Sequence, residues 1–254
     1  DLKDLESTYF KEASSFLKEI SESFDKKISV LDIGCGTGHF MEQLVAKGYR
    51  VDGVVPSETF CQAARDRMTA LGNNTSQVFQ CPFQDLPKID NANLYDVAIF
   101  SESFQYIPLE EIFGRLPDLL RPGGHALVCD FFKTAAHGDG QPGDRSFGGG
   151  HLLMQFYRQL AQAPFEVLHD EDLTRRVSPT IELLDEWLSN RITPAGRTLD
   201  SYLLGNYPLL TRVLKWLLRH RLERLQFKYL SGNRTRTVFE KYKSYRLVVL
   251  RRGL

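Results

Sequence analysis

The sequence has no net charge, few cysteines and no long apolar runs. It carries 32 Lys and Arg against 32 Asp and Glu, so its net charge is zero and no whole-chain field draws it toward nucleic acid or a membrane. The four cysteines form no C-x-x-C pair, which argues against a zinc knuckle and a disulfide framework. Few, scattered cysteines fit a reducing compartment, and we expect a cytoplasmic protein.

No uncharged apolar run reaches the length of a membrane-spanning helix, and we expect no signal peptide before the fold. The chain begins at Asp1 rather than at a methionine, so a removed targeting segment stays an open alternative.

What the sequence does contain is an alternation of short apolar runs with helical patterns. The apolar runs predict strands at 27–33, 49–55, 76–81, 95–101 and 125–132. Helical patterns closed by glycine lie between them at 38–48, 57–72 and 109–124. This alternation predicts an α/β fold with a doubly wound, mostly parallel sheet that is covered on both faces.

The segments on either side of this core complete the predicted organisation. An amphipathic helix is predicted at 5–24, a glycine-rich loop at 133–150, a helix at 151–162, a strand at 165–171, helical structure at 180–230 and a last strand at 243–252. We therefore predict an N-terminal helical cap (1–26), a ligand-binding core (27–132), a loop and helical lid over the acceptor (133–235), and a final core strand (236–254).

A glycine-rich motif follows the first predicted strand in VLDIGCGTGHF, residues 30–40. In a doubly wound sheet, ligands bind at the carboxyl ends of the strands, where glycines let the backbone approach them closely. The spacing is G-x-G-x-G after an aspartate, whereas enzymes that bind a nicotinamide dinucleotide carry G-x-G-x-x-G. The motif therefore favours a different nucleoside ligand over a nicotinamide dehydrogenase.

The segment LDIGCGTG resembles the first motif of class I (Rossmann-like) S-adenosylmethionine-dependent methyltransferases of the small-molecule type. VDGVVPS (51–57) resembles the second motif of that family, and RPGGHALV (121–128) a later one. The resemblance covers residues 28–132 and returns at 243–252. It implies a seven-stranded sheet, S-adenosylmethionine as the methyl donor and S-adenosylhomocysteine as the product. Because SESF stands where modifiers of bases and glutamine carry an N-P-P-Y-type tetrapeptide, it also implies a small-molecule acceptor.

The resemblance also implies which residues contact the donor. They are Asp32, Gly34, Cys35 and Gly36 at the methionyl end, Val55 and Pro56 beside the ribose, Phe83 and Gln84 at the adenine, and Ser101 and Glu102 on the sulfonium side. Val55 stands where the family usually has an acid that accepts hydrogen bonds from the ribose, and Pro82 where an aspartate is common. Either Glu58 or Asp52 replaces the acid at Val55, or the donor binds unusually weakly, or the chain is a variant of the family.

The acceptor site is predicted from segments that follow the fourth and fifth strands. His137 and His151 are candidates for a catalytic base because histidine titrates near neutral pH. Tyr106 is the third catalytic candidate, Gln105 a substrate contact, and Arg234 and Arg236 contacts for an anionic acceptor. A divalent metal held by Asp139, Asp144 and the two histidines stays an alternative, but no metal is predicted. The many glycines of 133–150 are typical of a mobile lid.

The segment 211–236 carries eight Arg or Lys residues against one Glu, interleaved with Trp and Leu. It is typical of a solvated helix face or of peripheral contact with an anionic membrane, while nucleic acid is not expected as a partner. The sequence thus predicts methyl transfer from S-adenosylmethionine to a small-molecule metabolite. The alternatives are methylation of a protein or RNA, and a cofactor-binding protein without methylation activity.

Overall fold

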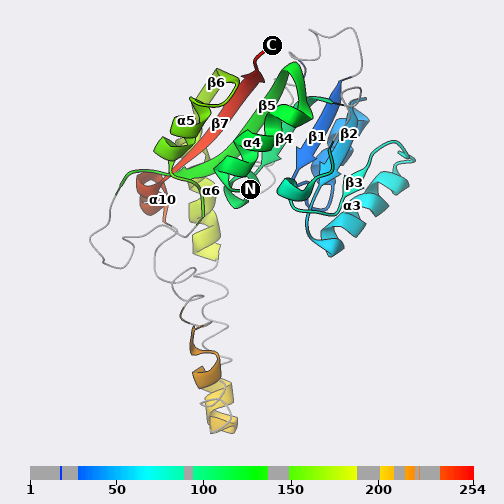
Figure 1. Ribbon diagram of the computed structural model, residues 1–254. Coiled ribbons are helices and arrows are strands. Elements are labelled where there is room, and N and C mark those ends of the chain that lie inside the picture. The colour runs from blue at the N-terminus through cyan, green and yellow to red at the C-terminus, as the bar shows by residue number, and fades with distance from the viewer. Residues whose placement is uncertain are drawn as a thin grey trace. The chain divides into compact units, whose positions relative to one another are not determined.

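The computed structural model of the chain describes residues 18, 28–88, 94–136, 149–187, 201–208, 215–220, 223 and 235–254 (Figure 1). The chain divides into two compact units. The described part of the first, the core unit, is residues 18, 28–88, 94–133, 149–173 and 245–254. The described part of the second, the helical unit, is residues 134–136, 174–187, 201–208, 215–220, 223 and 235–244.

A seven-stranded sheet forms the centre of the core unit. Its strands are β1 (Ser29–Ile33), β2 (Arg50–Val54), β3 (Val78–Phe79), β4 (Tyr95–Ser101), β5 (Leu120–Lys133), β6 (Phe165–Asp172) and β7 (Lys243–Arg252). They lie in the order β3-β2-β1-β4-β5-β7-β6. The pairs β1–β2, β1–β4, β2–β3 and β4–β5 are parallel, and β6–β7 is antiparallel. The predicted doubly wound, mostly parallel sheet is confirmed.

Both faces of this sheet are covered, as the alternation of side chains along β1 shows. Leu31 and Ile33 belong to one buried apolar cluster, and Ile28 and Val30 belong to another. The first cluster includes side chains of α4 (Leu109–Leu119) and α5 (Leu153–Leu160). The second includes side chains of α2 (His39–Ala46) and α3 (Glu58–Ala70). The sheet therefore has two apolar cores, one under each layer of helices (Figure 1).

Aromatic packing fixes the segment that follows β4. Phe104, in the short helix η3 (Phe104–Tyr106), is buried. Its ring lies 5.2 Å from that of Phe100, 5.9 Å from that of Phe132 and 5.6 Å from that of Phe156, measured between ring centroids. The pairs with Phe100 and Phe156 are edge-to-face, an arrangement that is favourable beyond the area that it buries. The chain leaving β4 is thus held against β5 and α5 rather than left as a loose loop.

Several predicted boundaries shift in the structure. The helix predicted at 109–124 ends at Leu119, and β5 begins at Leu120. The glycines of RPGG do not close a helix. A Cβ at Gly124 would lie 2.9 Å from the carbonyl oxygen of Arg121, so a glycine is needed inside the strand. The strand predicted at 76–81 is confined to the two residues of β3. The predicted N-terminal helix lies outside the described residues apart from Lys18.

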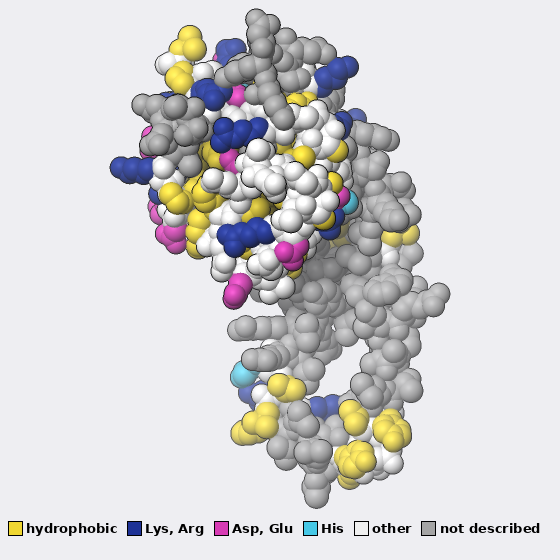
Figure 2. Space-filling model, turned by 90° about the vertical axis from the view of Figure 1, so that its right-hand side faces the viewer, with side chains coloured by type: hydrophobic (Ala, Val, Ile, Leu, Met, Phe, Trp, Pro, Cys, Tyr) yellow, Lys and Arg dark blue, Asp and Glu magenta, His cyan; other side chains and the backbone are white. Residues whose placement is uncertain are grey.

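The helical unit contains α6 (Thr174–Trp187), α10 (Arg236–Tyr242) and helical residues at 201–206 and 215–217. Within it, Glu240 accepts hydrogen bonds from Ser178 at 2.5 Å and from Arg236 at 2.8 Å, which links α6 to α10. Large apolar side chains of residues 201–208 and 215–220 are exposed (Figure 2). None of the helices in the described part of the chain is long and apolar enough to cross a membrane.

The two units have other boundaries than the predicted regions 133–235 and 236–254, and residues 236–244 belong to the helical unit. Residues 149–173, which form α5 and β6, belong to the core unit. Helix α10 precedes the final strand within the segment 236–254.

Candidate active site

The loops that follow β1 and β4 meet at the carboxyl edge of the sheet, and Gly34 makes their contact possible. Gly34 has a φ of 83°, and a Cβ at this position would lie 2.3 Å from the Cβ of Ser103. The hydroxyl of Ser103 donates a hydrogen bond to the carbonyl of Ile33, the last residue of β1. The backbone N–H of Gly34 donates to Val54 at the end of β2, over 2.8 Å. Only glycine fits this junction of three strand ends.

Gly36 has the opposite surroundings. Its φ is 52°, but a Cβ built on it would meet no atom within 4 Å. The backbone here therefore borders open space at the same edge of the sheet. A ligand can approach the main chain at Gly36, which the motif predicts and which any larger side chain would hinder.

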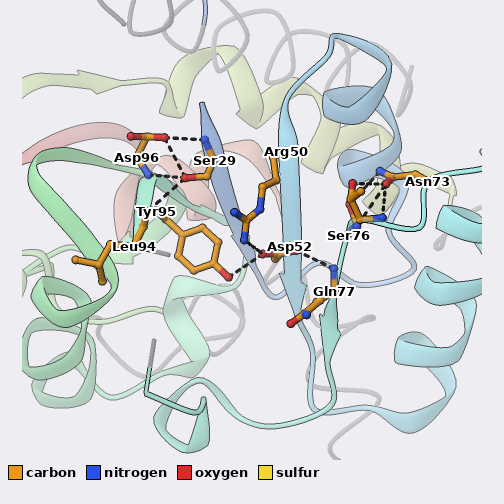
Figure 3. Close-up of polar contacts among 10 residues, drawn as sticks. Ser29, Arg50, Asp52, Asn73, Ser76, Gln77, Leu94, Tyr95 and Asp96 are labelled. Atoms are coloured by element: carbon orange, nitrogen blue, oxygen red, sulfur yellow. Dashed lines mark hydrogen bonds and ion pairs between the residues drawn. The ribbon is translucent and has the colours of Figure 1, made fainter. Parts of the chain in front are cut away.

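Four aspartates are buried in the described part of the chain, and comparing them shows which one is unusual. Asp52 accepts hydrogen bonds from the backbone N–H of Gln77 at 2.7 Å and from the hydroxyl of Tyr95 at 3.0 Å, and it lies 3.5 Å from Arg50 (Figure 3). One donor thus precedes β3, and the other lies in β4, on the far side of β1 from β2. Asp52 is a structural carboxylate with its oxygens in use.

Asp96 and Asp130 also have their partners within the fold. Asp96 accepts from the backbone N–H of Ser29 at 2.8 Å and from its hydroxyl at 3.0 Å (Figure 3). It also pairs with Arg121. Asp130 accepts from the backbone N–H and the side-chain amide of Gln105, each at 3.0 Å. Burial nevertheless raises the pKa of Asp130 to about 7.

Asp32, the fourth buried aspartate, is the exception. It is 1% exposed, and its Oδ2 has no hydrogen-bond partner among the described residues. Burial raises the pKa of its carboxyl group to about 7. An unsatisfied buried oxygen of this kind is rare and costs stability, so it calls for a functional explanation. Because Asp32 stands two residues before Gly34, the explanation that fits is a ligand at the glycine loop.

Glu102 is the first residue after β4, and its backbone is strained. Its φ of 52° is the only positive φ of a non-glycine residue in the part of the chain that the structure describes. Its carboxylate is exposed and accepts a hydrogen bond from the hydroxyl of Tyr245, in β7, over 3.0 Å. Such left-handed residues cluster at functional sites because the surrounding structure must hold them. Glu102 therefore presents a fixed carboxylate at the edge of the sheet.

His151 is brought to the same edge by two glycines. A Cβ at Gly149 would lie 2.5 Å from Oε1 of Gln105, and one at Gly150 would lie 2.7 Å from the carbonyl oxygen of Phe131. This close approach places Nε2 of His151 at 3.1 Å from the carbonyl oxygen of Phe104. A carbonyl only accepts hydrogen bonds, so Nε2 must carry the proton of this contact. In the neutral ring, the lone pair then lies on Nδ1, where a general base needs it.

Comparison with known proteins identifies the fold and the domain. Residues 30–124 match the family model of a methyltransferase domain. The chain carries a class I methyltransferase domain. The sterol 4-C-methyltransferase strm-1 of Caenorhabditis elegans is 29% identical over 118 residues, which are 46% of this chain and 34% of that protein. The chain spans less than half the length of the curated relatives that it matches.

Solved structures share the fold over nearly the whole chain. A protein from Galdieria sulphuraria, itself assigned only by inference as a sarcosine dimethylglycine methyltransferase, has a TM-score of 0.73 at 15% identity and covers 100% of this chain and 88% of its own. The (4+2) cyclase SpnF has a TM-score of 0.61 at 21% identity, with 95% of this chain and 81% of its own covered. At these identities the likeness shows the fold alone. The cyclase also shows that a protein of this fold can carry another activity.

Within the methyltransferase domain, the predicted ribose and adenine contacts lie as follows. Val55 is buried in the core beside α3, and the saturated carboxylate of Asp52 is not free to replace an acid there. Glu58, in the first turn of α3, is exposed, as is Pro56. Phe83 is buried and packs on Phe100 at 5.9 Å between ring centroids, so only its backbone remains for a ligand. The neighbouring predicted contacts differ in exposure: Gln84 is exposed, and Cys35 is buried.

The remaining predicted residues divide between the two units. Ser101, Gln105, Tyr106 and His151 belong to the core unit, and Tyr106 is largely exposed. Arg236 belongs to the helical unit, where its guanidinium is bonded to Glu240. His137, Arg234, Asp139 and Asp144 lie outside the described residues.

Three contributors to the site are absent from the sequence predictions. Ser103 lies inside the quoted SESF segment, but no pattern indicates its contact with Gly34. Asp130 lies within the apolar run 125–132, which predicts a strand and gives no sign of a role for its carboxylate. Tyr245 contacts Glu102 across 143 residues of sequence, which only the sheet topology reveals. Their roles depend on strand order rather than on local spacing.

A separate groove of about 510 Å³ lies beside β3 and α3. It is lined by Arg65, Asn73 and Gln77 among others, and by none of the predicted site residues. The side chain of Asn73 folds back on its own turn, with Oδ1 accepting a hydrogen bond from the backbone N–H of Ser76 at 3.3 Å (Figure 3). The chemistry of the carboxyl edge therefore does not extend to this groove.

Proposed function

We propose that this chain transfers a methyl group from S-adenosylmethionine to a small-molecule acceptor at the carboxyl edge of β1, β4 and β5. The observation that carries the proposal is the orphaned Oδ2 of Asp32, four residues before the open backbone of Gly36, in a domain that matches a methyltransferase family. The name of the sterol methyltransferase relative supports a small acceptor.

The residues present suit this donor at its methionyl end. S-adenosylmethionine supplies an electrophilic methyl group on a positively charged sulfur. Asp32 would accept a hydrogen bond from the ammonium group of the methionyl moiety, which would give Oδ2 the partner that it lacks. Gly34 keeps the loop packed on Ser103, and Gly36 leaves room for the ligand.

The nucleoside end requires a different acid from the usual one. Val55 cannot accept a hydrogen bond from the ribose hydroxyls, and Asp52 is already saturated. Glu58 is exposed in the first turn of α3, three residues after Val55. We assign the ribose contact to Glu58 because it is the nearest carboxylate in sequence that has no partner assigned to it in the described structure.

The acceptor side is built around His151. The contact with Phe104 holds the ring with Nε2 as donor, and Nδ1 is then able to take the proton of an acceptor hydroxyl or amino group. Asp130 holds Gln105 in place by accepting hydrogen bonds from its backbone N–H and its side-chain amide, and the amide oxygen lies against Gly149. Glu102 adds a carboxylate held by Tyr245.

These side chains favour an acceptor with hydroxyl or amino groups. The anionic acceptor predicted from Arg234 and Arg236 stays a prediction, and Arg236 is engaged with Glu240. The polar side chains that we assign to the acceptor side are carboxyl and amide groups: Glu102, Gln105 and Asp130. Carboxylates would repel a phosphate or carboxylate acceptor in a partly buried site.

The proposal is tested by donor binding to Gly36→Leu, with Gly72→Leu as the matched control. Both glycines have a positive φ, and neither has an atom within 4 Å of a built Cβ. Each leucine therefore costs a similar backbone strain of about 1–2 kcal/mol. Equilibrium dialysis with labelled S-adenosylmethionine should show binding lost in the first variant and kept in the second. Equal binding by both variants would contradict the placement of the donor at this loop.

A second function is favoured by Val55 and by the fold of the cyclase: use of the bound cofactor without methyl transfer. It is distinguished by incubating the protein with methyl-labelled donor and a set of small alcohols, phenols and amines. Label recovered in an acceptor supports methyl transfer. Tight donor binding with no label transferred to any class of acceptor supports the second function.

A further inference from the structure

The helical unit presents an unusual surface at residues 215–220, Lys-Trp-Leu-Leu-Arg-His, which we name the tip segment. Trp216 is 71% exposed and Leu217 is 66% exposed, and Leu218 is exposed as well. Lys215, Arg219 and His220 are exposed alongside them. Apolar side chains lie next to basic and histidine side chains at the lower end of Figure 2. Three consecutive large apolar side chains in water are unfavourable unless they serve a contact.

Two tyrosines of the same unit add to the exposed aromatic surface. Tyr202 and Tyr207 are both more than half exposed, and the backbone of residues 201–206 is helical. Tyrosine and tryptophan are the residues that favour the boundary between water and the hydrocarbon of a bilayer, because each has an apolar ring and a polar end.

The charge of the chain is segregated in this region. Residues 211–236 contain eight Arg or Lys residues and one Glu, which leaves 24 basic and 31 acidic residues in the rest of the chain. The neutral whole thus consists of a strongly basic segment and an acidic remainder. A basic segment that also exposes Trp and Leu has the composition of helices that lie at anionic membrane surfaces.

We propose that the tip segment binds the surface of an anionic phospholipid membrane, with Trp216, Leu217 and Leu218 entering the headgroup region and Lys215 and Arg219 contacting lipid phosphates. A symmetric dimer through two tip segments is a poorer arrangement, because two basic surfaces would then face each other. Nucleic acid would match the charge but not the row of exposed apolar side chains. The proposal does not depend on the proposed methyl transfer.

The test uses the intrinsic fluorescence of the tip segment. The chain has two tryptophans, so Trp187→Phe leaves Trp216 as the only reporter. This variant is mixed with vesicles of phosphatidylcholine and phosphatidylserine at a ratio of 7:3, and separately with pure phosphatidylcholine. We expect a blue shift of the emission and co-sedimentation with the anionic vesicles only, and we expect 0.5 M salt to release the protein.

Two variants and a matched control assign the contact. Lys215→Gln with Arg219→Gln should lower the partition coefficient at least tenfold, since each basic residue near an anionic surface contributes about fivefold. Trp216→Ala, made in the wild-type background and followed by co-sedimentation, should lower it by about tenfold because its ring no longer enters the interface. Met154→Ala, in α5 of the core unit, removes an apolar side chain that is 69% exposed and should change nothing.

Three outcomes would overturn the proposal. The first is binding to neutral and anionic vesicles alike. The second is an emission spectrum of Trp216 that stays unchanged with anionic vesicles. The third is a dimer in light scattering that Trp216→Ala dissociates, which would make the tip segment an interface between copies of the chain.

Discussion

Replacing Asp32 by asparagine should stabilise the unliganded protein above pH 7, although the residue is buried and central to the proposed site. The carboxyl is fully buried, its Oδ2 lacks a partner among the described residues, and burial raises its pKa from 3.8 to about 7. Between pH 3.8 and pH 7, the carboxyl group of Asp32 is therefore protonated in the folded protein and ionised in the unfolded protein. The free energy of unfolding must fall as the pH rises through this range.

The size of the effect follows from the pKa shift. Each tenfold change in proton affinity is worth about 1.4 kcal/mol, so the full penalty of ionising Asp32 is about 4 kcal/mol above pH 7. At pH 5.5 only about 2 kcal/mol of it applies. Asparagine has no charge to bury and removes this pH-dependent part. Its own unpaired amide adds a cost of about 1–3 kcal/mol, which is the same at every pH.

Urea denaturation of the wild type and Asp32→Asn at pH 5.5 and pH 8 measures this directly. The variant should gain about 2 kcal/mol relative to the wild type between the two pH values, whatever the constant offset. Asp96→Asn is the control, because Asp96 is equally buried but accepts from Ser29 and pairs with Arg121. It should be destabilised at both pH values by about 3 kcal/mol. A pH-independent difference for Asp32→Asn would refute the reasoning.

Three further changes test other parts of the site. His151→Gln keeps an N–H group that can donate a hydrogen bond to the carbonyl of Phe104, but it removes the base. Turnover should therefore fall at least 100-fold at neutral pH, while the affinity for S-adenosylmethionine in calorimetry stays unchanged. Unchanged turnover would exclude His151 from catalysis. Gly34→Ala forces a Cβ into Ser103 at a φ of 83° and should cost about 3 kcal/mol, seen as a fall of about 10 °C in Tm; an unchanged Tm would contradict the packing. Glu58→Gln should weaken S-adenosylmethionine binding about tenfold in the same calorimetry, and equal affinity would exclude it from the ribose site.

The sequence was sufficient to predict the sheet and the glycine loop because both depend on residues that are close together in the sequence. Apolar runs marked the strands, and the aspartate and glycines of residues 32–38 marked the ligand edge. The end of α4 was misplaced, because Gly123 and Gly124 follow a helical pattern as closing glycines do. In the fold, Gly124 instead permits close packing within β5.

The polar contacts of the site were not predictable, because they depend on which strands become neighbours. Asp52 and Asp32 look alike in sequence, each in a β-strand near a glycine. Tyr95 and Gln77 donate hydrogen bonds to Asp52, whereas Oδ2 of Asp32 has no partner among the described residues. Likewise, the contact of Tyr245 with Glu102 exists because β7 is inserted beside β5, far along the chain.

The central claim is that the glycine loop and Asp32 bind S-adenosylmethionine, and calorimetry of the wild type tests it most directly. Titrations with S-adenosylmethionine at pH 6 and pH 8 should give micromolar binding that is about tenfold tighter at pH 8, because the ammonium group binds the ionised form of a carboxyl whose pKa is about 7. Proton release at pH 6, seen as a dependence of the heat on the buffer, should accompany it. No binding at either pH, or equal binding of NAD, would contradict the account.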